Sequence, residues 1–157
     1  MKIQINSLFK IIFIITIFLS SESFSIEKGR WTFTKDKDWC YIGSIPLQEE
    51  GDYTKRGDTY FLVYRINNQP NPEIQINAGY NYSQTKEVEI IIDNNKNILS
   101  IIEGDTAWAE NDKKIIESMK KGKEMIIKGT SSRGTLTTDT YTLIGFTAAY
   151  NQLKKDC

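Results

Sequence analysis

Four carboxylates gather around a tryptophan in the segment EGDTAWAEND, where residue types and spacing could support acid–base chemistry: Glu103, Asp105, Glu110 and Asp112 around Trp108. Two of these carboxylates could act as general acid and base beside a stacking indole, which would make the chain a carbohydrate-active hydrolase. The same oxygens could bind calcium, although their spacing is not that of an EF-hand loop. The interpretation we favour is a polar loop in which Trp108 packs into the core and Asp112 caps the next helix.

Other catalytic and cofactor signals are absent from the sequence. The chain contains no histidine, which excludes Ser-His-Asp and Cys-His nucleophilic catalysis and removes the commonest zinc and copper ligand. It contains neither a GxxxxGK[ST] phosphate loop nor a GxGxxG fingerprint. We therefore expect no catalytic residue, no metal and no cofactor.

A second candidate constellation combines one aspartate with two arginines. Asp139 lies in a threonine-rich predicted strand, on the face that also carries Tyr141 and Leu143, so this face is assigned to the core. A buried carboxylate needs a partner. We expect Arg133 or Arg56, each followed by glycine, to form a structural ion pair with it; an exposed recognition surface is the alternative.

Basic residues on one predicted helix form a third candidate. Lys113, Lys120 and Lys121 lie opposite an apolar stripe and, with Trp108, could form a surface that contacts anionic lipid or polysaccharide. Glu117 dilutes this charge, and a solvated helix face is the interpretation we favour. Over the whole chain, 20 basic residues balance 20 acidic ones, so we expect no nucleic-acid partner.

The N-terminus is typical of a signal peptide. Lys2 and Lys10 precede an apolar run over residues 11–19, and residues 23–25 have the small-x-small form of a cleavage site. An uncleaved anchor is the alternative, but a spanning helix needs roughly 20 apolar residues. We expect cleavage after Ser25, no transmembrane anchor afterwards, and one domain over residues 26–157, in the periplasm or secreted.

Two cysteines, Cys40 and Cys157, lie near the two ends of the predicted domain. Paired thiols persist as disulfides in the oxidising space outside the cytoplasm, so we expect a Cys40–Cys157 bridge. A metal-binding or redox pair is the alternative, but there is no CxxC spacing and no histidine to assist.

The rest of the chain has the pattern of an all-β protein. Alternating apolar residues and turn signals predict strands at residues 31–34, 39–44, 59–66, 74–77, 88–92, 98–102, 124–129 and 135–143. A helix is expected from Asn111 or Asp112 to Gly122, and a short C-terminal helix over residues 146–153. We predict a β-sandwich of about eight short antiparallel strands with these two helices; a partly closed β-barrel is the alternative.

Several short motifs, in order along the chain, resemble the invasion-associated locus B family of exported alphaproteobacterial proteins. They lie at residues 39–42, 56–60, 78–80, 104–109, 119–122, 128–139 and 145–149. The resemblance implies a β-rich, non-enzymatic envelope protein with one cysteine near each end. The family's name comes from a link to invasion of host cells, but free-living bacteria also carry such proteins. The partner expected from this resemblance is an unidentified envelope protein or glycan.

Overall fold

Two antiparallel sheets packed face to face form the part of the chain that the computed structural model describes, residues 27–66 and 69–157. The six-stranded sheet contains, in spatial order, β1 (Thr32–Lys35), β2 (Trp39–Ser44), β4 (Tyr60–Ile66), β5 (Glu73–Asn77), β9 (Thr106–Trp108) and β8 (Ile101–Glu103). The five-stranded sheet contains β3 (Gln48–Gly51), β11 (Leu136–Thr142), β10 (Glu124–Thr130), β6 (Val88–Ile92) and β7 (Asn95–Leu99). The predicted signal peptide at residues 1–25 lies outside the described residues.

The core lies between the two sheets because alternate side chains of each strand point inward. In β4, Phe61 and Val63 are fully buried, and Ile90 of β6 and Ile127 of β10 face them from the other sheet. Trp31 closes the core near β1, with its ring edge-on to Phe61 at a centroid distance of 5.8 Å. The predicted β-sandwich is confirmed, and the sheets do not close into a barrel.

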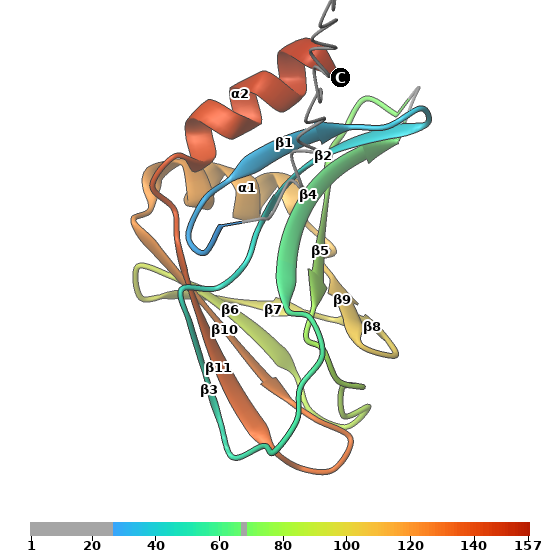
Figure 1. Cartoon of the computed structure of the whole chain (residues 1–157), viewed down its shortest axis with the longest axis vertical. Helices are drawn as coiled ribbons and strands as arrows, with labels where there is room; N and C mark the ends of the chain where they lie inside the picture. Colours follow the sequence, from blue (N-terminus) through green and yellow to red (C-terminus); the bar gives the residue numbers. More distant parts are fainter. Residues whose placement is uncertain (1–26, 67–68) are drawn as a thin grey trace, which may run out of the picture.

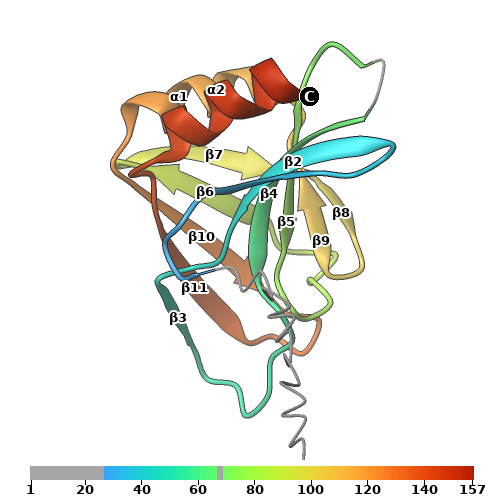
Figure 2. The same ribbon diagram turned by 45° about the horizontal axis from the view of Figure 1, so that its top comes forward.

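Both helices lie across one end of the sheets, and this end is called the helix end below (Figures 1 and 2). Helix α1 (Asp112–Lys121) begins after Asn111, whose side chain accepts a hydrogen bond from the Lys114 backbone N–H at 3.1 Å. It buries an apolar stripe that includes Met119 and ends at Gly122. Helix α2 (Phe146–Asp156) follows Gly145 and packs on β1, β2 and α1. The loops after β3 and between β10 and β11 lie at the opposite, loop end (Figure 1).

The structure has eleven strands in its described residues, more than the eight predicted. Strand β3 was missed because Gln48–Gly51 has no apolar alternation; it is an edge strand, held by backbone pairing with β11. The single strand expected over residues 98–102 is two strands, β7 and β8, which separate at Ser100 and join different sheets.

The segment around Trp108 also differs from the expected polar loop. Residues 101–108 form a β-hairpin that turns at Gly104, whose φ of 58° is in the left-handed region. Trp108 is in β9 and partly exposed, so it does not pack into the core. Of the two predicted caps for α1, Asn111 caps the helix, whereas Asp112 accepts a hydrogen bond from the Ile74 backbone N–H at 2.8 Å.

Candidate ligand-binding groove

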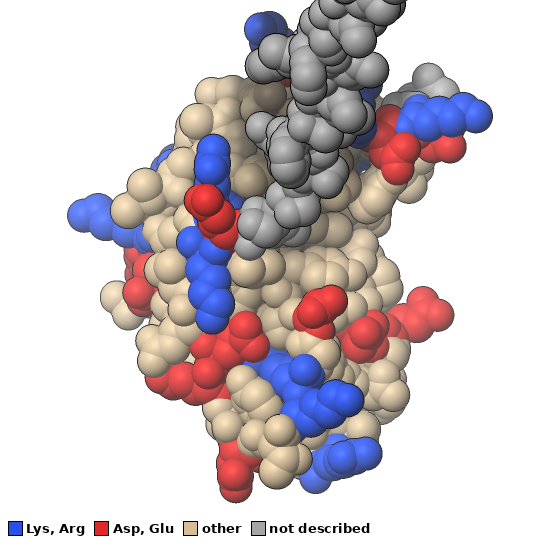
Figure 3. Space-filling view, in the orientation of Figure 1, with Lys and Arg blue, Asp and Glu red and all other residues tan. Residues whose placement is uncertain are grey.

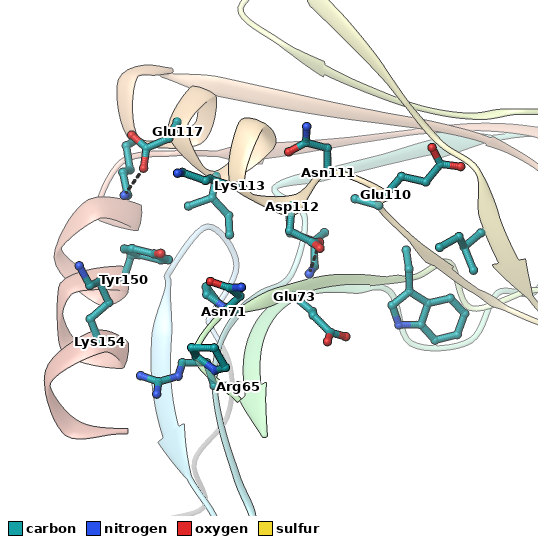
Figure 4. Close-up of a pocket in the computed structure, with 18 residues that line it drawn as sticks. Arg65, Asn71, Glu73, Glu110, Asn111, Asp112, Lys113, Glu117, Tyr150 and Lys154 are labelled. Carbon is teal, nitrogen blue, oxygen red and sulfur yellow. Dashed lines mark hydrogen bonds and ion pairs between the residues drawn. The ribbon is translucent and has the colours of Figure 1, made fainter. Parts of the chain in front are cut away.

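A groove of about 820 Å³ lies at the helix end, between the two helices and the adjacent edge of the six-stranded sheet. This volume is within the range of small-molecule binding sites. Figure 4 shows Glu110 at one end of the groove and Tyr150 and Lys154 of α2 at the other, with Asp112 between them. Trp108 also lines the groove. The groove thus joins segments from β5, β9, α1 and α2.

The carboxylates along the groove already have partners within the chain. Glu110 accepts a hydrogen bond from the Ser100 hydroxyl at 2.7 Å, and Glu73 accepts one from the Tyr64 hydroxyl at 2.6 Å. Burial raises the pKa of the Asp112 carboxyl, while the hydrogen bond that it accepts from the Ile74 backbone N–H lowers it. These acidic groups therefore stabilise the walls of the groove.

Two basic residues of the groove differ from these carboxylates, because they have no partner within the described residues. Lys120 is engaged, because it forms an ion pair with Glu117 at 2.6 Å and lies 4.3 Å from the centroid of the Tyr150 ring. By contrast, neither Lys113 nor Lys154 has a hydrogen-bond or ion-pair partner among the residues that the structure describes. Both are exposed on the helical side of the groove, so their ammonium groups are available to a ligand.

The structure brings together part of the predicted surface. Trp108, Lys113 and Lys120 line the groove, but Lys121 does not. Of the four predicted carboxylates, Glu110 and Asp112 line it, whereas the β8–β9 hairpin carries Glu103 and Asp105 away from it.

The groove also contains Arg65, Glu73, Tyr150 and Lys154, which were not predicted as site residues. Their contribution depends on how strand ends and α2 meet in space, and no local motif signals this arrangement.

Asp139 is buried at the loop end and paired with Arg56, not with Arg133. The guanidinium of Arg56 makes two hydrogen bonds to the carboxylate, each 2.6 Å long, and both side chains are only 3% exposed. Burial raises the pKa of Asp139, while the hydrogen bonds and positive charge of Arg56 lower it. Burial alone would lower the pKa of Arg56, but Asp139 outweighs this effect, so the net pKa is raised and the guanidinium remains charged. Arg133 lies in the exposed turn between β10 and β11.

Further contacts hold Arg56 in place. Its Nε donates to the Ala78 carbonyl at 2.7 Å, and its guanidinium lies 5.5 and 5.1 Å from the ring centroids of Tyr53 and Tyr80. A hollow of about 400 Å³ lies beside this pair, and both Arg56 and Arg133 line it. Because Arg56 is already surrounded by partners, the geometry is that of a structural pair.

The predicted disulfide between Cys40 and Cys157 is confirmed. It joins β2 to the end of α2, with the two Cα atoms 5.8 Å apart. It therefore ties the helix that forms one wall of the groove to the six-stranded sheet. Within the described residues, no group of three or more potential ligands could hold a metal ion.

Charges of both signs are interspersed on the face drawn in Figure 3, with no extended basic stripe over the described residues. This distribution agrees with the balanced composition of the chain. No helix in the described part of the chain combines the length and hydropathy needed to cross a membrane.

The fold and the groove define a class: a disulfide-tied, antiparallel β-sandwich with two helices across one end and a polar groove beneath them. Within this class, residues 32–154 match the family described as "Invasion associated locus B (IalB) protein". The chain therefore belongs to the invasion-associated locus B family.

A solved structure supports the assignment of the fold. The crystal structure of invasion associated protein b from Bartonella henselae is similar to this chain with a TM-score of 0.57 and 18% sequence identity. The similarity covers 83% of this chain and 96% of that one. A comparison with curated proteins gives no match.

Proposed function

We propose that this chain is an exported, non-enzymatic binding module of the bacterial envelope, periplasmic or secreted, and that the groove is its binding site. One observation carries the proposal: the acidic groups of the groove are used internally, whereas Lys113 and Lys154 have no partner among the described residues. A groove with a fixed acidic wall and available cations is suited to holding a partner. We propose that this partner is an envelope protein or a glycan.

Export is supported by the N-terminal sequence and by the disulfide. Residues 1–25 have the pattern of a signal peptide, and a disulfide such as Cys40–Cys157 persists in oxidising compartments. The related Bartonella protein is described as invasion associated. A role at the cell envelope fits these observations.

The alternative hydrolase would need two poised carboxylates beside Trp108. The raised pKa of Asp112 is in the direction that suits a general acid. However, Asp112 is bonded to the β5 backbone and Glu110 to Ser100, so both groups have structural partners. We therefore propose a binding function, and release of reducing sugar from envelope polysaccharide by the wild type but not by Asp112→Asn would contradict it.

The proposal can be tested by affinity capture from a solubilised bacterial envelope, with the exported protein as bait. The double variant Lys113→Ala/Lys154→Ala should capture about tenfold less partner than the wild type. The reason is that a charge-assisted contact contributes about 1.5 kcal/mol or more to the free energy of binding. The matched control is Lys121→Ala/Lys155→Ala, which removes one exposed lysine from each of the same helices outside the groove. Equal capture by the wild type and both double variants would show that the groove is not the site.

A further inference from the structure

A row of aromatic side chains covers the outer face of the six-stranded sheet. On β2, β4 and β9, alternate residues such as Cys40, Val63 and Ala107 are fully buried between the sheets. The residues between them must therefore point outward. This outer aromatic row consists of Trp39, Tyr41, Tyr64 and Trp108, all partly exposed.

Contacts between its members hold the row in place. Trp39 stacks on Tyr41 with ring centroids 4.7 Å apart and planes 30° apart, and it lies edge-on to Tyr64 at 6.2 Å. The Tyr64 hydroxyl donates a hydrogen bond to Glu73 at 2.6 Å, and the side chain of Trp108 lies beside this hydroxyl. The rings are thus preorganised, and a ligand would not need to order them.

The polar groups of this face are mostly hydrogen-bond acceptors and amides. Glu73 and Gln75 of β5 lie between the strands that carry Tyr64 and Trp108, because Tyr64 pairs with Glu73 and Gln75 with Trp108. The outward positions of the six strands, all of them described, carry Glu73 and Glu103 but no lysine or arginine. This charge pattern complements a ligand that presents hydroxyl donors and disfavours a phosphate-bearing one.

The row also leads into the groove. Trp108, Glu73 and the half-exposed Ile101 belong both to the outer face and to the lining of the groove. Three strand spacings separate β2 from β9, which corresponds to about 14 Å. A ligand that contacts Trp39 and Trp108 together must therefore be an extended chain.

We propose that the outer aromatic row binds a neutral glycan chain that continues into the groove. The apolar face of one pyranose ring stacks on Trp39 and that of a later ring on Trp108. Sugar hydroxyls donate to Glu73 and Gln75. Glu73 and Gln75 interrupt the apolar surface between the rings, which suits a ligand that alternates apolar ring faces with hydroxyl groups. This inference rests on the proposed binding function and names its class of ligand.

The test is binding of the purified exported protein to an array of neutral oligosaccharides that includes cellohexaose and chitohexaose, followed by titration calorimetry. Trp39→Ala and Trp108→Ala should each weaken binding about tenfold, since each removes one stacking ring. Trp39→Phe keeps a ring and should recover most of the affinity. Leu136→Ala, which removes an exposed apolar side chain from the other sheet, should leave it unchanged.

The outcomes separate this inference from the proposed function. If no neutral oligosaccharide binds, or if both tryptophan variants bind like the wild type, the glycan proposal is wrong. If the protein captures an envelope protein through Lys113 and Lys154 but binds no glycan, the binding function stands and its ligand is a protein. Thermal unfolding of each variant shows whether a loss of binding reflects a loss of fold.

Discussion

The two ends of the sandwich use charged side chains in opposite ways. At the loop end, Arg56 and Asp139 are buried and use their hydrogen-bonding capacity on each other and on Ala78. At the helix end, Lys113 and Lys154 face solvent without a partner in the described chain. A buried charge needs a partner within the protein, whereas an exposed charge is solvated by water and remains available to bind a ligand. The comparison therefore indicates a structural role for the charges at the loop end and agrees with the proposed binding role of those at the helix end.

The largest expected effect is at the loop end. Asp139→Ala removes both short hydrogen bonds of the buried Arg56 guanidinium and leaves only the Glu49 carboxylate, 3.7 Å away, as its counter-charge. The free energy of unfolding should therefore fall by about 3 kcal/mol. Asp139→Asn keeps the shape but not the charge and should also destabilise. Urea unfolding measures both changes. Thr138→Ala, at the neighbouring outward position of β11, is the matched control and should have little effect.

A different result would reverse the comparison. If Asp139→Ala and Asp139→Asn unfold like the wild type but no longer capture a partner, the Arg56–Asp139 pair belongs to recognition. A double-mutant cycle with Arg56→Ala then measures how much of the effect is shared by the two side chains.

The helix end depends on a covalent cross-link. Cys40→Ser should lower the free energy of unfolding by about 2–4 kcal/mol, because the bridge closes most of the chain into a loop. Since α2 carries Tyr150 and Lys154, the variant should also weaken capture by the groove. Differential scanning calorimetry of Cys40→Ser, Cys157→Ser and the reduced wild type should show the same loss; a wild type whose melting temperature does not respond to reduction would contradict this.

A close approach of two glycines positions Arg56, and it offers a smaller test. The Gly57 backbone N–H donates to the Gly79 carbonyl at 2.9 Å, and a Cβ added to Gly79 would lie 2.4 Å from the Gly57 oxygen. Gly79 also has a φ of 68°. Gly79→Ala should therefore cost about 1–3 kcal/mol through strain and displacement of the segment that carries Arg56.

Gly134 provides the matched control, because its φ is 90° but a Cβ there would have no neighbour within 4 Å. Gly134→Ala should lower the free energy of unfolding only by the strain of placing a side chain in the left-handed region, about 1 kcal/mol. Equal losses in the two variants, measured by thermal unfolding, would mean that the contact between Gly57 and Gly79 contributes nothing.

Much of the fold could be predicted from local patterns. The alternation in Leu136–Thr142 correctly placed Asp139 on the same buried face as Tyr141, because strand periodicity does not depend on tertiary context. Strand β3 could not be found, since its pairing energy comes from backbone groups and its side chains carry no pattern.

The site was less predictable than the fold. The sequence placed Trp108 near Asp112, but not whether the indole would face the core or solvent, because that depends on the hairpin at Gly104. Choosing Arg56 over Arg133 as the partner of Asp139 required knowing how the distant loop that carries Arg56 packs against β11. Lys154 enters the groove only because α2 folds back across the sheet end.

The smallest expected effect concerns the boundary between the groove and the aromatic row. Burial, followed by the hydrogen bond and charge of Glu73, raises the pKa of Tyr64 to about 12, above the ordinary value of about 10. A group whose pKa is higher in the folded state contributes its full stability below pH of about 10 and loses it as the pH rises toward 12.

Tyr64→Phe removes this group. It should cost about 1 kcal/mol at pH of about 9, where the neutral hydroxyl donates to Glu73. The difference from the wild type should shrink as the pH rises from about 10 to 12, because the tyrosinate then faces a carboxylate and repels it. Urea unfolding of both proteins across this pH range measures the difference in their free energies of unfolding. The titration of the other tyrosines is common to both proteins and cancels in this difference. A constant difference would mean that Tyr64 does not interact with Glu73, and the aromatic row would then lack the contact that links it to the groove.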